Sequence, residues 1–155
     1  MMAKKKTSHP FLKLLCFIYC GFMTYLLFFR AWRYVPEISY WEQVMANMER
    51  QPFRTIQNFI AVIQVGPSHQ DYRLCLTNMV GNTALFVPAG LLFPKLFRKW
   101  RPFWRFFLHA VCLIALVEVV QLFSLLGIFD VDDIILNVLG MSFGYFLYFL
   151  FMRKE

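Results

Sequence analysis

The sequence predicts an all-α integral membrane protein, with a bundle of four transmembrane helices in one membrane domain, 1–155. Composition is the first observation behind this prediction. The chain is 59% hydrophobic and 16% charged, and its mean hydropathy is +0.53, whereas soluble proteins are about 25% charged. The second observation is that the charges lie between long apolar runs. Together these features exclude a soluble domain, a disordered tail and a disulfide-stapled mini-domain.

Four apolar runs are long enough to cross a bilayer. The first run, 14–29, spans roughly 24 Å as a helix, and Lys13 and Arg30 extend it to both membrane surfaces by snorkelling. No small-residue cleavage site follows this run, so we expect an uncleaved helix and not a signal peptide. We expect the other three helices, which contain no Lys or Arg, at residues 74–94, 106–128 and 134–152.

The distribution of cations predicts which ends of the helices face the cytoplasm. Lysines at 4–6 precede the first run, the 95–105 connector contains Lys and Arg but no acid, and cations at 153–154 follow the last run. Cytoplasmic loops have this composition, so both termini and the connector are predicted inside. The 130–133 turn carries three Asp and no cation, which places it outside.

The segment between the first two helices, 31–73, is then extracytoplasmic. Within it Ile56, Phe59, Ile60 and Ile63 repeat at the spacing of an amphipathic helix. Such a helix either lies on the membrane surface or covers the outer end of the bundle, and the spacing allows both.

Glu118 is the charged residue inside an apolar run. A charged side chain at the centre of a membrane helix costs at least about 2.5 kcal/mol and normally faces the bundle interior or a water-filled cavity. Gln121 follows on the same helix face. Counted from the predicted helix end at residue 128, Glu118 lies about 15 Å below the outer end, near the middle of the membrane.

Other polar side chains converge on the same outer half of the membrane. They predict a polar cleft open to the extracytoplasmic side, suited to the headgroup of an amphiphile, a cation or a peptide. A structural role stays open, because amides also join neighbouring helices and Asp residues also cap helices. The predicted ligand-binding residues are Asn78, Asn82, Glu118, Gln121, Asp130, Asp132, Asp133 and Asn137.

Several other partners and groups are not expected. The net charge of +7 arises from cations in the connectors and the termini, so we expect no nucleic-acid partner. The three His residues lie away from the acidic turn, and we expect no metal and no cofactor. The four Cys act as small apolar residues. Gly140 and Gly144 form a small-xxx-small surface for close helix packing, through which an oligomer is possible.

Short motifs in the second half of the chain resemble the VanZ-like family of membrane proteins. Their order and spacing agree across residues 78–150. An upstream stretch, Pro52 to Ile56, resembles the family's N-L-x-P-F-x-T-I element, with Arg50 and Gln51 in the leading positions. The motifs are Gly81-Asn82, Phe86-Val87-Pro88-Ala89-Gly90, Glu118-x-x-Gln121, Phe129-Asp130-Val131-Asp132-Asp133, Asn137 and Gly140.

The resemblance implies a multi-pass protein of the bacterial cell membrane. The named member of the family is associated with low-level resistance to teicoplanin, a lipidated glycopeptide that acts outside the membrane. Partners of this chain, besides the lipid bilayer, are then a lipoglycopeptide or a lipid-linked cell-wall precursor. Both have parts in the outer leaflet, where the polar cleft is predicted.

Three functions agree with these features. We favour a non-enzymatic protein that contributes to glycopeptide resistance or envelope physiology by binding an amphiphile or a partner protein. The alternative is an intramembrane enzyme that acts on a lipid-linked envelope substrate, with Glu118 as general acid or base and the Asp residues orienting substrate or holding a divalent cation. Transport of a small solute or a proton through Glu118 is the third. No nucleophilic Ser or Cys beside a His is visible, which disfavours the enzyme.

Overall fold

The computed structural model describes residues 10–29, 37–49, 51–65 and 69–152. The short elements are β1 (Met48–Glu49), β2 (Phe129–Asp130), the 3-10 turn η1 (Arg98–Trp100) and the π-helical turn η2 (Tyr148–Met152), which continues the last helix. The α-helices are α1 (Pro10–Phe28), α2 (Tyr40–Ala46), α3 (Arg54–Val65), α4 (His69–Leu96), α5 (Phe103–Phe123) and α6 (Val131–Leu147).

Within these ranges four helical stretches are long and apolar enough to cross a membrane. They are Pro10–Phe28, Met79–Leu96, Phe103–Phe123 and Val131–Met152. The predicted all-α membrane fold with four spanning helices is therefore confirmed.

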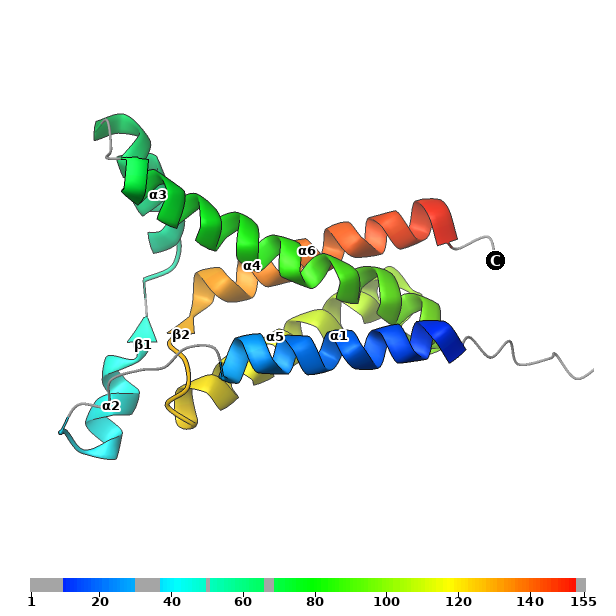
Figure 1. Ribbon diagram of the computed structural model, residues 1–155, viewed down its shortest axis with the longest axis horizontal. Coiled ribbons are helices and arrows are strands. Elements are labelled where there is room, and N and C mark those ends of the chain that lie inside the picture. The colour runs from blue at the N-terminus through cyan, green and yellow to red at the C-terminus, as the bar shows by residue number, and fades with distance from the viewer. Residues whose placement is uncertain (1–9, 30–36, 50, 66–68, 153–155) are drawn as a thin grey trace, which may run out of the picture.

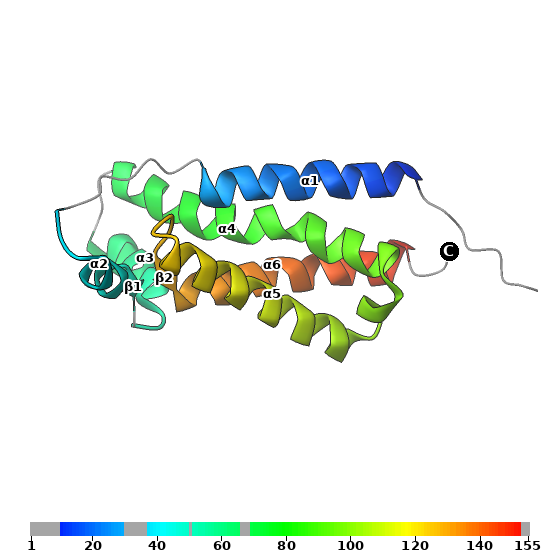
Figure 2. The same ribbon diagram turned by 90° about the horizontal axis from the view of Figure 1, so that it is seen from below.

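The long helices run side by side, and the short elements gather at the two ends of the bundle (Figures 1 and 2). We call one end the strand end, because α2, α3, β1 and β2 lie there. We call the other the basic end, because it holds the cationic connector between α4 and α5 and the last turn of α6. That the basic end faces the cytoplasm and the strand end faces outward stays a prediction from the charge distribution.

Helices α4 and α6 make the closest contact in the bundle. A Cβ atom at Gly140 would lie 2.0 Å from the Thr83 carbonyl oxygen, and a Cβ at Gly144 would lie 2.0 Å from the Val87 carbonyl oxygen. Only glycine lets the two backbones approach so closely. The predicted small-residue contact is therefore made within the chain, against α4. An oligomer through this face stays a prediction, and it would require α4 to leave these glycines.

The core lies among the four long helices, α1, α4, α5 and α6. Phe106, Ala110 and Ile114 of α5 are buried against Met141 and Tyr145 of α6. The Phe106 and Tyr145 rings lie with their centroids 4.5 Å apart. This packing holds α5 and α6 against each other.

Helix α1 joins the bundle through two hydrogen bonds to backbone carbonyls. The Tyr19 hydroxyl donates to the Leu85 carbonyl of α4 at 2.8 Å, and Gln121 Nε2 of α5 donates to the Leu27 carbonyl at 2.8 Å. The outward side chains of α1 are large and apolar, with Phe11 74% and Phe17 78% exposed. In a membrane such side chains contact lipid.

The predicted helix boundaries differ from the observed ones, since charges mark the part of a helix in lipid and not its hydrogen-bonded ends. Helix α5 begins directly after Pro102 and ends at Phe123, whereas the predicted range was 106–128. Its end is set by Leu125, whose φ is 57°, and by backbone hydrogen bonds from the next two residues to the Gln121 carbonyl. The other three helices begin earlier than predicted, at Pro10, His69 and Val131.

The predicted amphipathic helix of the 31–73 segment is α3. It contacts α4 and α6, while Ile60 and Ile63 stay exposed. Helix α2 was not predicted, although its signal is in the sequence: Ser39 and Glu42 form a reciprocal capping box. These hydrogen bonds from Ser39 hold the pKa of Glu42 below its ordinary value. Residues 30–36, 50 and 66–68 lie outside the described part of the segment.

Candidate functional site

Two very short strands join the segment after α2 to the turn before α6. In this parallel pair Met48 lies beside Phe129, and Glu49 lies beside Asp130. The Phe129 N–H also donates to the Asn47 carbonyl at 2.9 Å. Two-residue strands have little stability of their own, so their role is to fix where the chain crosses the acidic turn. We call residues 47–49 and 51–54 the cap segment.

Asp130 is the N-cap of α6. Its carboxylate accepts a hydrogen bond from the Asp132 N–H at 2.8 Å, which stabilises the first turn of the helix. Burial raises the pKa of Asp130 above its ordinary value. The hydrogen bond from Asp132 opposes this shift, the charges of Asp132 and Glu49 add to it, and Arg54 opposes it. The capping role considered for the acidic turn is therefore confirmed for Asp130.

Asp132 attaches the cap segment to α6. Its side chain is fully buried, and its Oδ1 accepts a hydrogen bond from the Phe53 N–H at 2.5 Å. Phe53 has a φ of 65°, in the left-handed region that costs a residue with a Cβ roughly 1–2 kcal/mol. Arg54, the next residue, forms an ion pair with Glu49. The Glu49 carboxylate also accepts a hydrogen bond from the backbone N–H of Gln51 at 3.1 Å. These contacts of the cap segment therefore keep the Phe53 backbone in its strained conformation.

Asp133 connects α6 to α4. Asn82 Nδ2 donates to Asp133 Oδ1 at 2.6 Å, so these two predicted site residues, 51 positions apart in the chain, are in direct contact. Asn78 lies one turn earlier on α4, but its side chain is outside the described part of the structure.

Glu118 approaches the same turn from α5. Its side chain is 3% exposed, and its Oε2 accepts a hydrogen bond from the Asp130 N–H at 3.3 Å. It also lies close enough to Asp133 and Asp130 to interact with their charges. Among the described residues no Lys or Arg forms an ion pair with Glu118.

The depth of Glu118 differs from the prediction. Because α5 ends at Phe123 and not at 128, Glu118 lies five residues from the helix end, about 7.5 Å along the axis. It is therefore closer to the strand end of the bundle than the predicted helix range placed it. This shorter depth is what lets its carboxylate reach the backbone of the turn.

Asn137 and Gln121 differ in their surroundings. Asn137 is 4% exposed, and its Oδ1 has no hydrogen-bond partner in the described part of the chain. It lies one turn from Asp133 on the same side of α6. Gln121 instead bonds to the α1 backbone, which is the helix-joining role left open for the amides. The structure therefore does not bring the Gln121 side chain to the acidic turn.

We call Asn82, Glu118, Asp130, Asp132 and Asp133 the acid cluster. It comes from α4, α5 and the start of α6, and the cap segment lies against it. The predicted convergence of these residues is observed, but as a hydrogen-bonded cluster, whereas the sequence predicted side chains lining an open cleft. Glu118 and Asp132 are buried in it, and the other three members are partly buried. Chemically the cluster offers carboxylate oxygens, which accept hydrogen bonds and attract cations.

A metal centre is not formed by this arrangement. Across residues 10–29, 37–49, 51–65 and 69–152, no group of three or more His, Cys, Asp or Glu has the placement needed to hold a metal ion. The carboxylates instead accept from backbone N–H groups and from Asn82.

Sequence reasoning missed the contribution of Glu49, Phe53 and Arg54 to this site. The strand pair that places them depends on contacts between residues about 80 positions apart, for which apolar periodicity carries no signal. The available signal was the Pro52 to Ile56 motif, which identified the stretch without indicating what it contacts.

Comparison with curated proteins and with solved structures finds no match. The family model described as VanZ/LLP1 matches residues 12–152, a range that contains the whole acid cluster and nearly all of the four long helices. This match confirms the resemblance carried by the motifs of the acidic turn. The chain therefore belongs to the VanZ/LLP1 family.

Proposed function

We propose that this protein binds the headgroup of an amphiphile through its acid cluster, and in this way contributes to teicoplanin resistance or to another function of the bacterial cell envelope. The ligand is a lipoglycopeptide or a lipid-linked cell-wall precursor. Membership of the VanZ/LLP1 family supports a role in teicoplanin resistance, because the family name is associated with glycopeptide resistance.

The observation that carries the proposal is the burial of Glu118, with the partly buried Asp133 close by, and neither forms an ion pair with a Lys or Arg among the described residues. Removing a carboxylate from water costs several kcal/mol even after the surroundings relax. Ionisable groups kept in such positions within membrane proteins are typical of functional sites. A ligand that brings N–H donors or a positive charge would stabilise these carboxylates.

The cap segment controls access in this proposal. It is attached to the cluster by the Phe53 hydrogen bond and by the two-residue strand pair. Elements held by so few contacts open at low free energy, while the bundle stays folded. A ligand donor then replaces the Phe53 N–H on Asp132, and Arg54 and Glu49 move with the segment.

A second candidate function is favoured by the environment of Glu118. It is buried beside two other carboxylates and accepts from the Asp130 N–H. Neighbouring carboxyl groups in different environments are the usual basis of acid and base roles in hydrolysis. In this alternative the protein is an intramembrane enzyme that acts on a lipid-linked envelope substrate, with Glu118 transferring the proton.

Drug susceptibility tests the proposal. The protein is expressed in a sensitive Gram-positive host, which is then exposed to a lipidated and a non-lipidated glycopeptide. Glu118→Gln removes the buried charge and keeps the side-chain shape. Glu42→Gln is the matched control, since it makes the same change on the exposed surface of α2. We expect selective protection against the lipidated drug by the wild type and by Glu42→Gln, and none by Glu118→Gln at equal membrane abundance.

Equal protection by both variants would exclude the acid cluster as the binding site. If the wild-type protein is abundant and gives no protection, the role in drug resistance is excluded. The profile of lipid-linked precursors in the same cells would then test the envelope role. Purified protein in vesicles distinguishes the binding function from the enzymatic one. An enzyme converts the added precursor into a product that mass spectrometry detects, whereas a binding protein leaves the precursor unchanged.

A further inference from the structure

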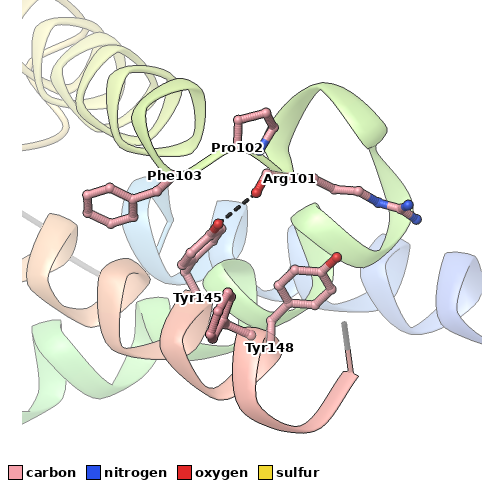
Figure 3. A pocket seen from close by; sticks show the side chains of 6 residues that line it. Arg101, Pro102, Phe103, Tyr145 and Tyr148 are labelled. Atoms are coloured by element: carbon pink, nitrogen blue, oxygen red, sulfur yellow. Dashed lines mark hydrogen bonds between the residues drawn. The ribbon is translucent and has the colours of Figure 1, made fainter. Parts of the chain in front are cut away.

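A partly open pocket of about 590 Å³ lies at the basic end of the bundle, away from the acid cluster (Figure 3). It is formed where the α4–α5 connector meets the last turns of α6. The sequence did not predict it, because its two sides are about 45 residues apart in the chain. The lining residues are Arg101, Pro102, Phe103, Tyr145, Tyr148 and Phe149.

The two tyrosines differ in how their hydroxyl groups are used. The Tyr145 hydroxyl donates to the Arg101 carbonyl at 2.6 Å and fixes the connector against α6. Tyr148 is only 3% exposed, and its hydroxyl makes no hydrogen bond with any residue in the described part of the chain. Figure 3 shows this hydroxyl pointing toward the side of the pocket on which the Arg101 side chain lies. A tyrosine hydroxyl at the pocket that no described residue uses is a donor available to a ligand.

The pocket is electrically positive. Arg101 Nε donates to the Pro94 carbonyl at 3.3 Å, which leaves the two terminal guanidinium nitrogens for another acceptor. Pro102 caps α5 without a side-chain hydrogen bond, so the first N–H groups of this 21-residue helix add partial positive charge. The neighbouring stretches, 93–109 and 141–152, contain no Asp or Glu.

The other walls of the pocket are apolar and face outward. Phe103 is 46% exposed and Phe149 is 44% exposed. Trp104, 78% exposed, follows on α5, and tryptophan is typical of the level at which lipid headgroups meet the hydrocarbon. The pocket therefore combines a cationic, hydrogen-bonding side with an apolar side at the membrane interface.

We propose that this pocket binds an anionic phospholipid. The Arg101 guanidinium and the Tyr148 hydroxyl hold the phosphate, and the acyl chains lie against Phe103 and Phe149. Guanidinium groups bind phosphate oxygens through two parallel hydrogen bonds, and basic pockets between membrane helices bind anionic lipid headgroups. This site is independent of the acid cluster, which has the opposite charge and lies at the other end of the bundle.

The proposal is tested with the full-length protein in phosphatidylcholine vesicles that contain spin-labelled phosphatidylglycerol or spin-labelled phosphatidylcholine. The fraction of immobilised label reports lipid bound to the protein. We expect preferential immobilisation of phosphatidylglycerol. Arg101→Gln should weaken it about tenfold, the loss of one charge-assisted contact, and Tyr148→Phe should weaken it several-fold. Arg105→Gln is the control, because it removes a nearby charge in the first turn of α5 that does not line the pocket.

Three results would overturn the proposal. The first is equal immobilisation of the two lipids by the wild type. The second is an equal loss in Arg101→Gln and Arg105→Gln, which would assign the effect to general surface charge. The third is complete displacement of the labelled lipid by millimolar inorganic phosphate, which would make free phosphate the ligand. Tyr148→Phe keeps the ring and its packing, so its result remains informative if Arg101→Gln fails to fold.

Discussion

Each carboxylate at the start of α6 has a different partner. Asp130 caps its own helix, Asp132 accepts from the cap segment and Asp133 accepts from α4. Asn137, one turn further along, keeps a buried oxygen without a partner among the described residues, at a cost of about 1–3 kcal/mol. Asn137 therefore reduces the stability of the folded chain, which agrees with a binding role at this end of the bundle.

Asp130 and Glu42 should respond to pH in opposite directions. The pKa of Asp130 is raised in the folded protein, so its ionisation destabilises the fold as pH rises above the ordinary Asp value of about 3.9. The pKa of Glu42 is lowered, so its contribution is present above the ordinary Glu pKa of about 4.3 and is lost as pH falls through the lowered value.

Thermal unfolding in detergent between acidic and neutral pH measures this difference. Asp130→Asn keeps the helix cap and should raise the melting temperature at neutral pH while leaving it unchanged at the acidic limit. Glu42→Gln should lower the melting temperature at neutral pH. A lower melting temperature for Asp130→Asn at neutral pH would contradict the assigned origin of the Asp130 shift.

At the scale of elements, the cap segment and the α4–α6 pair differ in how firmly they are held in place. The cap segment is held by a few hydrogen bonds around Phe53 and Glu49. The α4–α6 pair is held by close backbone contact at Gly140 and Gly144, which lie one helical turn apart. We therefore expect the cap segment to open while α4 and α6 remain packed.

Phe53→Pro tests the attachment of the cap segment. Proline lacks the N–H that Asp132 accepts, and its ring excludes the φ of 65° observed at this position. We expect faster hydrogen exchange at residues 47–54 and 129–132 with no change in the helices of the bundle. Phe53→Gly keeps the N–H and permits the same φ, so it should retain slow exchange. Equal exchange in the two variants would show that the Phe53 bond does not hold the segment.

Gly140→Ala tests the α4–α6 contact. The added Cβ would lie 2.0 Å from the Thr83 carbonyl oxygen, and separating the helices should cost about 1–3 kcal/mol or more. Gly21→Ala is the matched control, since nothing lies within 4 Å of a Cβ there, and alanine favours the helix over glycine. The melting temperature in detergent should fall for Gly140→Ala alone. An unchanged value would mean that the helices do not pack as described.

At the scale of the whole molecule, the lipid bilayer determines which features of the fold can be predicted from the sequence. Apolar runs must cross the bilayer as helices, so the number and order of the spans followed directly. Counting along those spans placed Glu118 in the same half of the bundle as Asp130 and Asp133, but too far from the helix end, because the end of α5 was predicted five residues late. The partner of Gln121 did not, because it depends on how α1 packs. The basic-end pocket and the cap segment were also beyond reach, since both are made by residues far apart in the chain.

The orientation of the bundle in the membrane remains a prediction, and cysteine labelling measures it. In a chain whose native cysteines are replaced by alanine, Ser39→Cys should react in intact cells with a reagent that does not cross the membrane. Lys99→Cys should react only after the cells are opened. The reverse pattern would place the acid cluster on the cytoplasmic side and would exclude a ligand in the outer leaflet.

The most direct test of the central claim, binding of an amphiphile at the acid cluster, is calorimetric titration of the protein in vesicles. The titrants are a lipidated glycopeptide, its non-lipidated counterpart and a lipid-linked cell-wall precursor. We predict that the wild type and Glu42→Gln bind the lipidated drug or the precursor with equal affinity. Glu118→Gln should bind at least about tenfold more weakly, because it loses one charge-assisted hydrogen bond. Equal affinity of all three proteins, or no binding of any titrant by the wild type, would contradict it.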